Sequence, residues 1–183
     1  MPDVKLHFIS HYNHMNKEDK VMNTLDYAIK MEYDGEKYYR EQAELNKNSG
    51  LHVVCNLLAD EEKGHAHILE NKKNQSAYKL PDSDFLAKAK NIFTGAQGIA
   101  VEGTQYPSQL DFYRIVCDME QKSIDLYQEF LAGAKNDEEK ELYEYLMHQE
   151  KQHLEAFEEM SRLLQNAEWW IESPEFGRRR EEY

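Results

Sequence analysis

The chain has 183 residues, of which 40% are hydrophobic and 31% are charged. This length and composition predict one globular domain with a full hydrophobic core. The formal net charge of -13 at pH 7 argues against a nucleic acid or an anionic membrane as a partner, because binding phosphate groups needs a basic surface.

The start of the chain and its cysteines bear on its location. The N-terminal stretch, MPDVKLHFIS, lacks the charged start and the continuous apolar run of a signal peptide. No apolar run approaches the ~20 residues that a membrane-spanning helix needs. Neither Cys55 nor Cys117 belongs to a CxxC pair, so free thiols are expected. We therefore expect a cytoplasmic protein.

Long segments with few glycines and prolines predict helices. They cover about residues 20–46, 51–77, 109–134 and 137–166. Short turns join the first helix to the second and the third to the fourth, so each pair should form an antiparallel hairpin. A longer connection over about residues 78–108, with a short helix over Asp84–Asn91, joins the two hairpins.

These elements predict an all-α fold, an antiparallel four-helix bundle of two helical hairpins joined by one long crossover. The bundle should cover residues 20–166, with an N-terminal arm over residues 1–19 and a C-terminal tail over residues 167–183. The arm carries histidines and the tail carries Trp169 and Trp170, and neither pattern indicates a role.

An internal repeat places glutamate and histidine at equivalent positions in two halves of the chain. The tetrad E-K-x-H occurs over Glu62–His65 and again over Glu150–His153. The offset between the two tetrads also carries Glu32 to Glu120, and each of these glutamates follows a methionine. Several positions matched at one fixed offset indicate two halves built on one plan.

Helix geometry should bring these residues to one level of the bundle. At ~1.5 Å per residue, Glu32 and Glu62 both lie roughly 20–25 Å from the turn that joins their helices. Glu120 and Glu150 have the same separation in the second hairpin. A glutamate at i and a histidine at i+3 lie on one face of a helix. The residues expected to meet are Glu32, Glu62, His65, Glu120, Glu150 and His153.

Six such groups in a core need a counter-charge. Each unpaired buried carboxylate costs several kcal/mol, and two divalent cations would remove that cost. Carboxylate oxygen with imidazole nitrogen suits iron or manganese. One Glu from each of two helices, with Glu-x-x-His from each of the other two, is typical of di-iron and di-manganese bundles. A single Glu-x-x-His is more often a solvated glutamate beside an ordinary histidine, but two copies at matching spacing favour a dinuclear site.

At these motifs the sequence resembles the rubrerythrin branch of the ferritin-like superfamily, over about residues 20–165. The resemblance rests on both tetrads, on Met31-Glu32 with Tyr39, and on Met119-Glu120 with Tyr127. It implies a ferritin-like fold and a non-haem di-iron site, in which either the two tetrad glutamates or the other two glutamates bridge the metals. It also implies reaction with hydrogen peroxide or dioxygen.

Two departures from that family matter for function. Rubrerythrins proper carry a C-terminal rubredoxin domain with two CxxC pairs, which this sequence lacks, so electrons would come from an external, rubredoxin-like donor protein. Ser123 stands where peroxidase-type rubrerythrins place an extra glutamate. The remaining six ligands form a symmetric set, which is also similar to the ferroxidase centre of bacterioferritin.

The expected function is that of a non-haem di-iron oxidoreductase, a peroxidase that reduces hydrogen peroxide in oxidative-stress defence. Its cofactor would be two iron ions per chain, with manganese or zinc as alternatives, and the protein would be a homodimer or a small homo-oligomer. Two other functions stay open: a ferroxidase that oxidises Fe(II) with dioxygen and handles iron in a hollow assembly, and a non-catalytic metal-binding module.

Three residues near the expected ligands have two interpretations each. The hydroxyls of Tyr39 and Tyr127 either donate hydrogen bonds to the ligand carboxylates or only pack in the core. Glu36 lies one turn from Glu32 and is either an extra, inward-facing ligand or half of an exposed ion pair with Arg40.

Overall fold

The computed structural model describes residues 24–95 and 106–172. Its helices are α2 (Thr24–Leu45), α3 (Gly50–Lys73), α4 (Phe85–Gly95), α5 (Tyr106–Ala132) and α6 (Asp137–Glu172). Neither described range contains a strand. The predicted all-α class is therefore confirmed.

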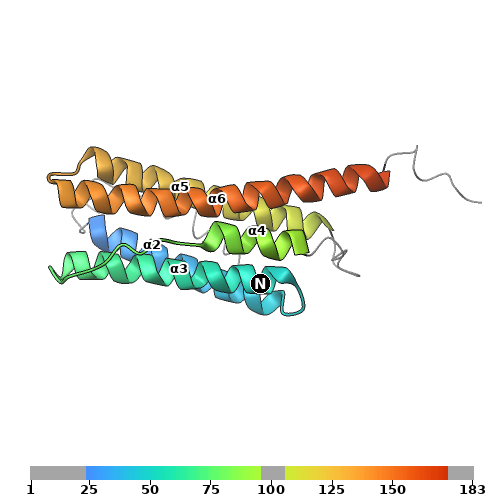
Figure 1. Ribbon diagram of the computed structural model, residues 1–183, viewed down its shortest axis with the longest axis horizontal. Helices are drawn as coiled ribbons and strands as arrows, with labels where there is room; N and C mark the ends of the chain where they lie inside the picture. Colours follow the sequence, from blue (N-terminus) through green and yellow to red (C-terminus); the bar gives the residue numbers. More distant parts are fainter. Residues whose placement is uncertain (1–23, 96–105, 173–183) are drawn as a thin grey trace, which may run out of the picture.

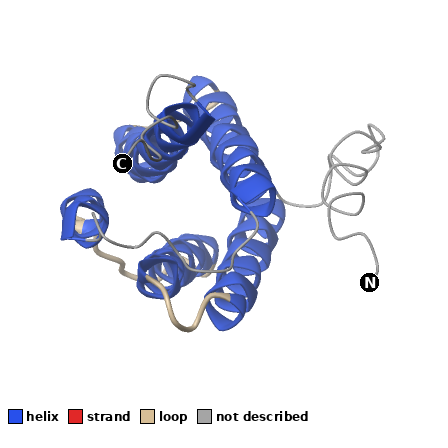
Figure 2. Ribbon diagram, turned by 90° about the vertical axis from the view of Figure 1, so that its right-hand side faces the viewer, coloured by secondary structure: helices blue, strands red, loops and turns tan. Residues whose placement is uncertain are grey.

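The long helices form two antiparallel hairpins. α2 packs along α3, and α5 packs along α6. Figure 1 shows the two hairpins side by side with α4 between α3 and α6, and Figure 2 shows the helices nearly end-on. The predicted bundle of two hairpins joined by one long crossover is confirmed, and the predicted short helix of the crossover is α4.

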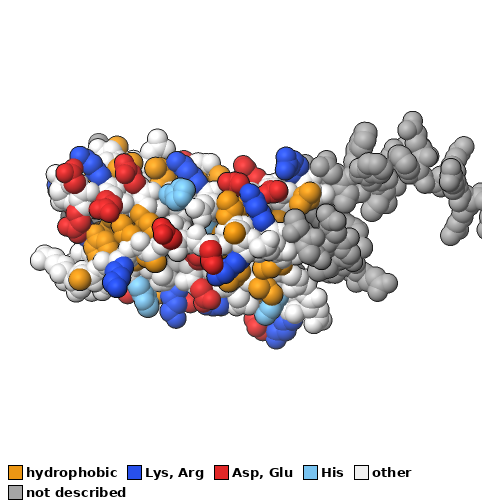
Figure 3. Space-filling model, in the orientation of Figure 1, with side chains coloured by type: hydrophobic (Ala, Val, Ile, Leu, Met, Phe, Trp, Pro, Cys, Tyr) orange, Lys and Arg blue, Asp and Glu red, His pale blue; other side chains and the backbone are white. Residues whose placement is uncertain are grey.

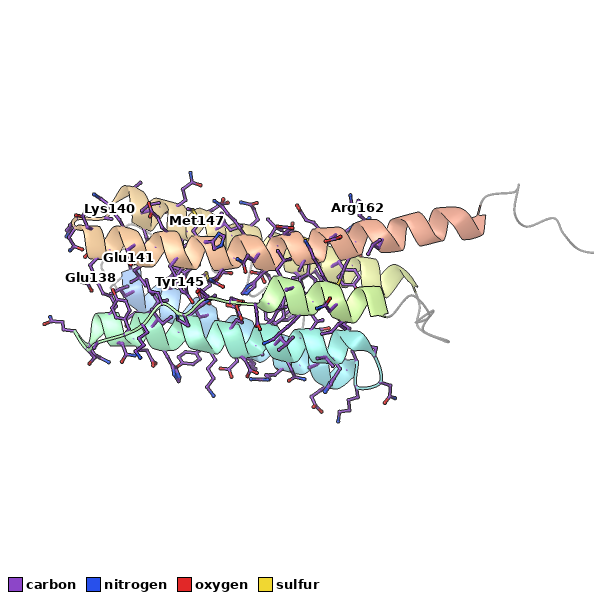
Figure 4. The ribbon with its side chains drawn as sticks, in the orientation of Figure 1. Glu138, Lys140, Glu141, Tyr145, Met147 and Arg162 are labelled. Carbon is purple, nitrogen blue, oxygen red and sulfur yellow. The ribbon has the colours of Figure 1, made fainter. Side chains whose placement is uncertain are left out.

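The first part of the crossover is tied to α6. After α3 the chain runs back along the bundle before α4 begins (Figure 1). The Tyr78 hydroxyl donates a hydrogen bond to Glu138 Oε1 at 2.9 Å. The hydroxyl of Tyr145, labelled on α6 in Figure 4, donates to the carbonyl oxygen of Pro81 at 2.9 Å. These bonds fix the path of the crossover over one side of the bundle.

Two helix ends next to the crossover differ from the prediction. α3 ends at Lys73 instead of about residue 77, because Gln75 has a φ of 54°, outside the helical region. α5 begins at Tyr106, ahead of the predicted start at about residue 109. Pro107 does not prevent this, since proline is tolerated in the first turn of a helix.

The last helix is longer than predicted. α6 continues to Glu172 instead of ending at about residue 166, because neither glycine nor proline interrupts the chain before Pro174. The predicted N-terminal arm, residues 1–19, lies outside the described residues, as do residues 173–183 of the predicted tail.

The apolar core consists of two clusters with a polar layer between them. One cluster includes Leu58 and Phe157, and the other includes Leu69 and Leu142, all fully buried. On each of the four long helices, the chain passes from one cluster to the other at the buried glutamates of the repeat. Burying one leucine side chain contributes roughly 1.5–3 kcal/mol, so the two clusters hold the polar layer in place.

The surface of the bundle is mixed in character. On the face shown in Figure 3, acidic and basic side chains are scattered with apolar ones between them. In the two ranges that the structure describes, no helix is long and apolar enough to cross a membrane. The surface thus shows charged side chains in their usual exposed places, whereas the polar layer buries charged residues inside the bundle.

Candidate metal centre

The polar layer contains the six residues that the repeat predicts to meet. All four long helices contribute to it, and none of the six side chains belongs to a residue more than 5% exposed. The residues are Glu32 on α2, Glu62 and His65 on α3, Glu120 on α5, and Glu150 and His153 on α6. That they bind metal stays a prediction, but the fold brings all of them together.

Their ligand atoms fall into two groups, and within each group the atoms lie within 4.8 Å of one another. Each group offers three carboxylates and one imidazole, the oxygen and nitrogen donors that suit iron or manganese. One group is Glu32, Glu62, His65 and Glu150, and the other is Glu62, Glu120, Glu150 and His153.

Two glutamates are common to both groups. Glu62 and Glu150 occur in each, whereas the other four residues occur once. A carboxylate has two oxygens, so a shared glutamate can offer one oxygen to each metal position. The geometry therefore favours Glu62 and Glu150 as the bridging pair over the alternative pair, Glu32 and Glu120.

Several ligand atoms are buried without a hydrogen bond from any described residue. They are Nδ1 of His65, Nδ1 of His153 and both carboxylate oxygens of Glu150. His65 Nδ1 lies 3.0 Å from Glu150 Oε1, but outside hydrogen-bond geometry. Buried polar atoms normally have partners, so this donor set fits a pair of cations.

Burial and mutual contacts shift the protonation of the cluster. Burial raises the pKa of Glu32 and Glu120 well above the ordinary value for a carboxyl group. Burial also disfavours a charged imidazole, but contacts with the surrounding carboxylates outweigh it and raise the pKa of His65 and His153. These four groups therefore keep their protons to a higher pH than usual.

Metal affinity should consequently rise with pH. A cation must displace the protons that the four groups hold, and their raised pKa values extend this competition to higher pH. From about pH 6 to about pH 8, apparent affinity for Co²⁺ should increase by roughly tenfold for each proton displaced and each pH unit. Calorimetric titrations at several pH values measure this, and affinity that does not change over that range would contradict the expectation.

Two tyrosines link the hairpins through ligand carboxylates. The Tyr39 hydroxyl on α2 donates a hydrogen bond to Glu120 Oε1 on α5, and the Tyr127 hydroxyl on α5 donates to Glu32 Oε1 on α2. Burial raises the pKa of both phenols well above the ordinary value, so both remain protonated donors. In the structure, the hydroxyls of both tyrosines therefore donate hydrogen bonds to ligand carboxylates and do not only pack in the core.

Glu36 belongs to neither ligand group among the described residues. Its carboxylate lies 4.0 Å from Arg40 Nη2 and 3.9 Å from Lys63 Nζ. Its side chain is 20% exposed. Arg40 Nη2 donates a hydrogen bond to Asp60, so its contact with Glu36 is peripheral, and the role of Glu36 as an extra ligand stays a prediction.

Sequence reasoning missed Glu61, which contacts a ligand histidine. Glu61 Oε2 lies 3.3 Å from His153 Nε2, and Ser83 Oγ donates to Glu61 Oε1 at 2.7 Å. Partial burial alone would raise the pKa of Glu61, but the contacts with His153 and Ser83 lower it. The only signal in the sequence is its place beside Glu62, because its partners come from α6 and from the crossover.

The crossover and α6 cover the two imidazoles with aromatic rings. The Phe85 ring, at the start of α4, meets the His153 ring edge to face, with centroids 4.9 Å apart. The Tyr145 ring meets the His65 ring in the same way, with centroids 6.4 Å apart. The imidazole side of the cluster is therefore packed with protein.

A small cavity borders the cluster between α2 and α5. Its volume is about 10 Å³, close to what one water molecule needs. Gly35 and Ser123 both line it and occupy equivalent positions in the repeat. The Ser123 hydroxyl lies 3.7 Å from Met31 Sδ. The other lining residues are Glu32, Tyr39, Glu62, Met119 and Glu120. A small molecule in this cavity would lie next to the ligand carboxylates.

Comparison with known proteins identifies one family. The family model described as Rubrerythrin matches residues 23–161, which is more than half of the chain and includes both ligand groups. No curated protein and no solved structure matches the chain.

Proposed function

The chain belongs to the rubrerythrin family, and on this basis we propose that it is a non-haem di-iron oxidoreductase that reduces hydrogen peroxide to water. The observation that carries the proposal is the pair of buried ligand groups that share Glu62 and Glu150. Two ferrous ions bound there would supply one electron each, which together are the two electrons that the reduction of peroxide needs.

The overall reaction balances with an outside source of electrons. One peroxide molecule, two electrons and two protons give two water molecules. We propose that an external, rubredoxin-like protein donates the electrons that restore the ferrous state. Manganese or zinc could occupy the same oxygen and nitrogen donors. Zinc has no redox chemistry, so a zinc-loaded protein would be a non-catalytic module.

The hydrogen bonds from the tyrosines position the two glutamates that are not shared. Tyr127 bonds Oε1 of Glu32, and Tyr39 bonds Oε1 of Glu120. The other oxygen of each carboxylate, Oε2, lies 3.5 Å from a histidine Nδ1. Each of these glutamates therefore has one oxygen held by a phenol and one oxygen directed to the ligand group, which supports its role as a ligand of one metal.

The size of the cavity supports a small oxidant as substrate. A volume of about 10 Å³ is far below that of sites for organic ligands, which measure roughly 300–1,000 Å³. Gly35 contributes no side chain to the cavity and Ser123 contributes only a hydroxymethyl group. A space close to the size of one water molecule excludes organic substrates and does not distinguish peroxide from dioxygen.

The proposal is tested by the oxidation of the ferrous protein. The protein is loaded anaerobically with ferrous iron, the iron per chain is determined, and the loaded protein is mixed in a stopped-flow instrument with hydrogen peroxide or, separately, with dioxygen. We expect about two irons per chain and much faster oxidation by peroxide than by dioxygen.

Other outcomes would support the other functions. Faster oxidation by dioxygen with continued uptake of iron would support a ferroxidase that handles iron. Iron storage also needs a large hollow assembly, whereas we propose a homodimer or a small homo-oligomer, and size-exclusion chromatography distinguishes these. Bound zinc that iron cannot displace would support the non-catalytic module.

A further inference from the structure

The two ligand groups contain the same residue types, but among the described residues only His153 pairs with a carboxylate outside the groups. Glu61 contacts His153, whereas the equivalent position in the other half of the repeat is Gln149. We infer that Glu61 makes the metal position beside His153 the tighter of the two, so that this position takes up its divalent cation first. The inference rests on the proposed metal centre and concerns the order in which that centre fills.

Glu61 acts on the outer nitrogen of the imidazole. His153 Nδ1 faces the ligand group, at 3.4 Å from Glu62 Oε1 and 3.5 Å from Glu120 Oε2. His153 Nε2 lies 3.3 Å from Glu61 Oε2. If Nδ1 bound a cation, Nε2 would carry the ring proton and donate a hydrogen bond to Glu61 Oε2. A carboxylate in this place fixes the tautomer and makes Nδ1 a more basic, stronger ligand.

Glu61 is itself held by the crossover. Ser83 Oγ donates to Glu61 Oε1 at 2.7 Å and accepts a hydrogen bond from the backbone nitrogen of Phe85 at 3.0 Å. The Phe85 ring packs against His153. The start of α4 therefore fixes both the carboxylate and the imidazole. Holding both partners in this way avoids the loss of interaction energy that solvent and motion cause in exposed ion pairs.

The other half of the repeat lacks this arrangement. Within the described residues, every ion pair of His65 runs through Nδ1 to a ligand carboxylate. Gln149 is 3% exposed, and its Oε1 accepts no hydrogen bond from a described residue. An amide carries no net charge, so Gln149 cannot strengthen a histidine ligand as the Glu61 carboxylate does.

The difference should be large enough to separate two binding steps. Removing the group behind a metal-binding histidine typically lowers metal affinity about 10–100-fold. The position beside His153 should therefore bind its cation roughly 10–100-fold more tightly than the position beside His65.

The test uses Co²⁺, which does not change its oxidation state in air and suits the same donors as Fe²⁺. Co²⁺ is titrated into the full-length protein and followed by calorimetry and by its visible absorption. Glu61→Gln should weaken the first step by roughly 10–100-fold and bring the two steps together. Gln149→Glu should strengthen the second step. The double exchange should restore two unequal steps in the reverse order.

Two ligand variants assign each step to a position. Glu32→Gln removes a ligand only from the group that contains His65 and should leave the first step unchanged, whereas Glu120→Gln should remove that step. In the protein with the double exchange, these two effects should be interchanged. Glu144→Gln, at an exposed position on α6, is the matched control and should change neither step.

The results separate this inference from the proposed function. Two equal binding steps in the unaltered protein would overturn the inference but not the metal centre. The same holds if Glu61→Gln and the unaltered protein give identical titrations. The absence of any Co²⁺ binding would overturn the metal centre and the inference with it. Circular dichroism checks that each variant is folded. Gln149→Glu gives an independent test, because it adds a carboxylate without removing the one at Glu61.

Discussion

Glu150→Gln should remove both metal ions from the protein, whereas Glu32→Gln should remove only one. Glu150 belongs to both ligand groups, and Glu32 belongs to one. An amide keeps the size of the side chain but loses its charge and one of its two oxygen donors. The loss of affinity for Glu150→Gln should exceed the roughly 10–100-fold typical of groups that only support a ligand.

Metal content per chain after anaerobic loading and removal of free metal measures this difference. Glu62→Gln should behave as Glu150→Gln does, and Glu120→Gln as Glu32→Gln does, because the groups are related by the repeat. Glu144→Gln, exposed on the same helix as Glu150, should bind metal normally. Two retained metals in Glu150→Gln, or loss of both in Glu32→Gln, would show that the sharing of ligands is assigned wrongly.

Gly35→Val should slow the oxidation of the ferrous centre without changing its metal content. A Cβ atom at Gly35 would lie 3.5 Å from Glu62 Cγ and 3.6 Å from Glu62 Oε2, so the first carbon fits. The two methyl groups of valine are larger than the small cavity that Gly35 lines, so they would close it. An oxidant that enters must push these carbons aside, which should cost about 1–3 kcal/mol as overpacking does. Each 1.36 kcal/mol added to the barrier slows a reaction about tenfold, so the rate with peroxide should fall roughly tenfold or more.

Gly64→Val is the matched control for this experiment. Gly64 is also a helical glycine, but a Cβ atom there would meet no heavy atom within 4 Å. Both variants pay the same cost of valine in a helix, and only Gly35→Val blocks the cavity. Stopped-flow mixing with peroxide measures both rates. Equal rates in the two variants would mean that the oxidant reaches the metals by another route.

The fold is largely predictable from the sequence because its signals are local. Long segments without glycine or proline, joined by short turns, determine the hairpins and their pairing. The ends of the helices depend on finer features. Gln75 adopts a positive φ that no local pattern indicates, and α6 extends to Glu172 because nothing in the chain stops it earlier.

The ligand residues are predictable because the repeat and the helical spacing are both visible in the sequence. Contacts between elements are not. The crossed hydrogen bonds of Tyr39 and Tyr127 depend on how one hairpin faces the other. The role of Glu61 is hidden in the same way. In the sequence it is one of three consecutive acidic residues and resembles a solvated side chain. Its contacts with His153 on α6 and with Ser83 in the crossover appear only in the folded chain.

The two ligand groups imply that one chain holds two metal ions that share carboxylate ligands. Electron paramagnetic resonance of the protein, loaded anaerobically with two ferrous ions per chain and then fully oxidised, tests it most directly. Two ferric ions joined by shared ligands couple their spins, so the oxidised protein should have almost no ferric signal. A ferric signal equal to the bound iron would mean that the metal ions are separate and that Glu62 and Glu150 do not join them.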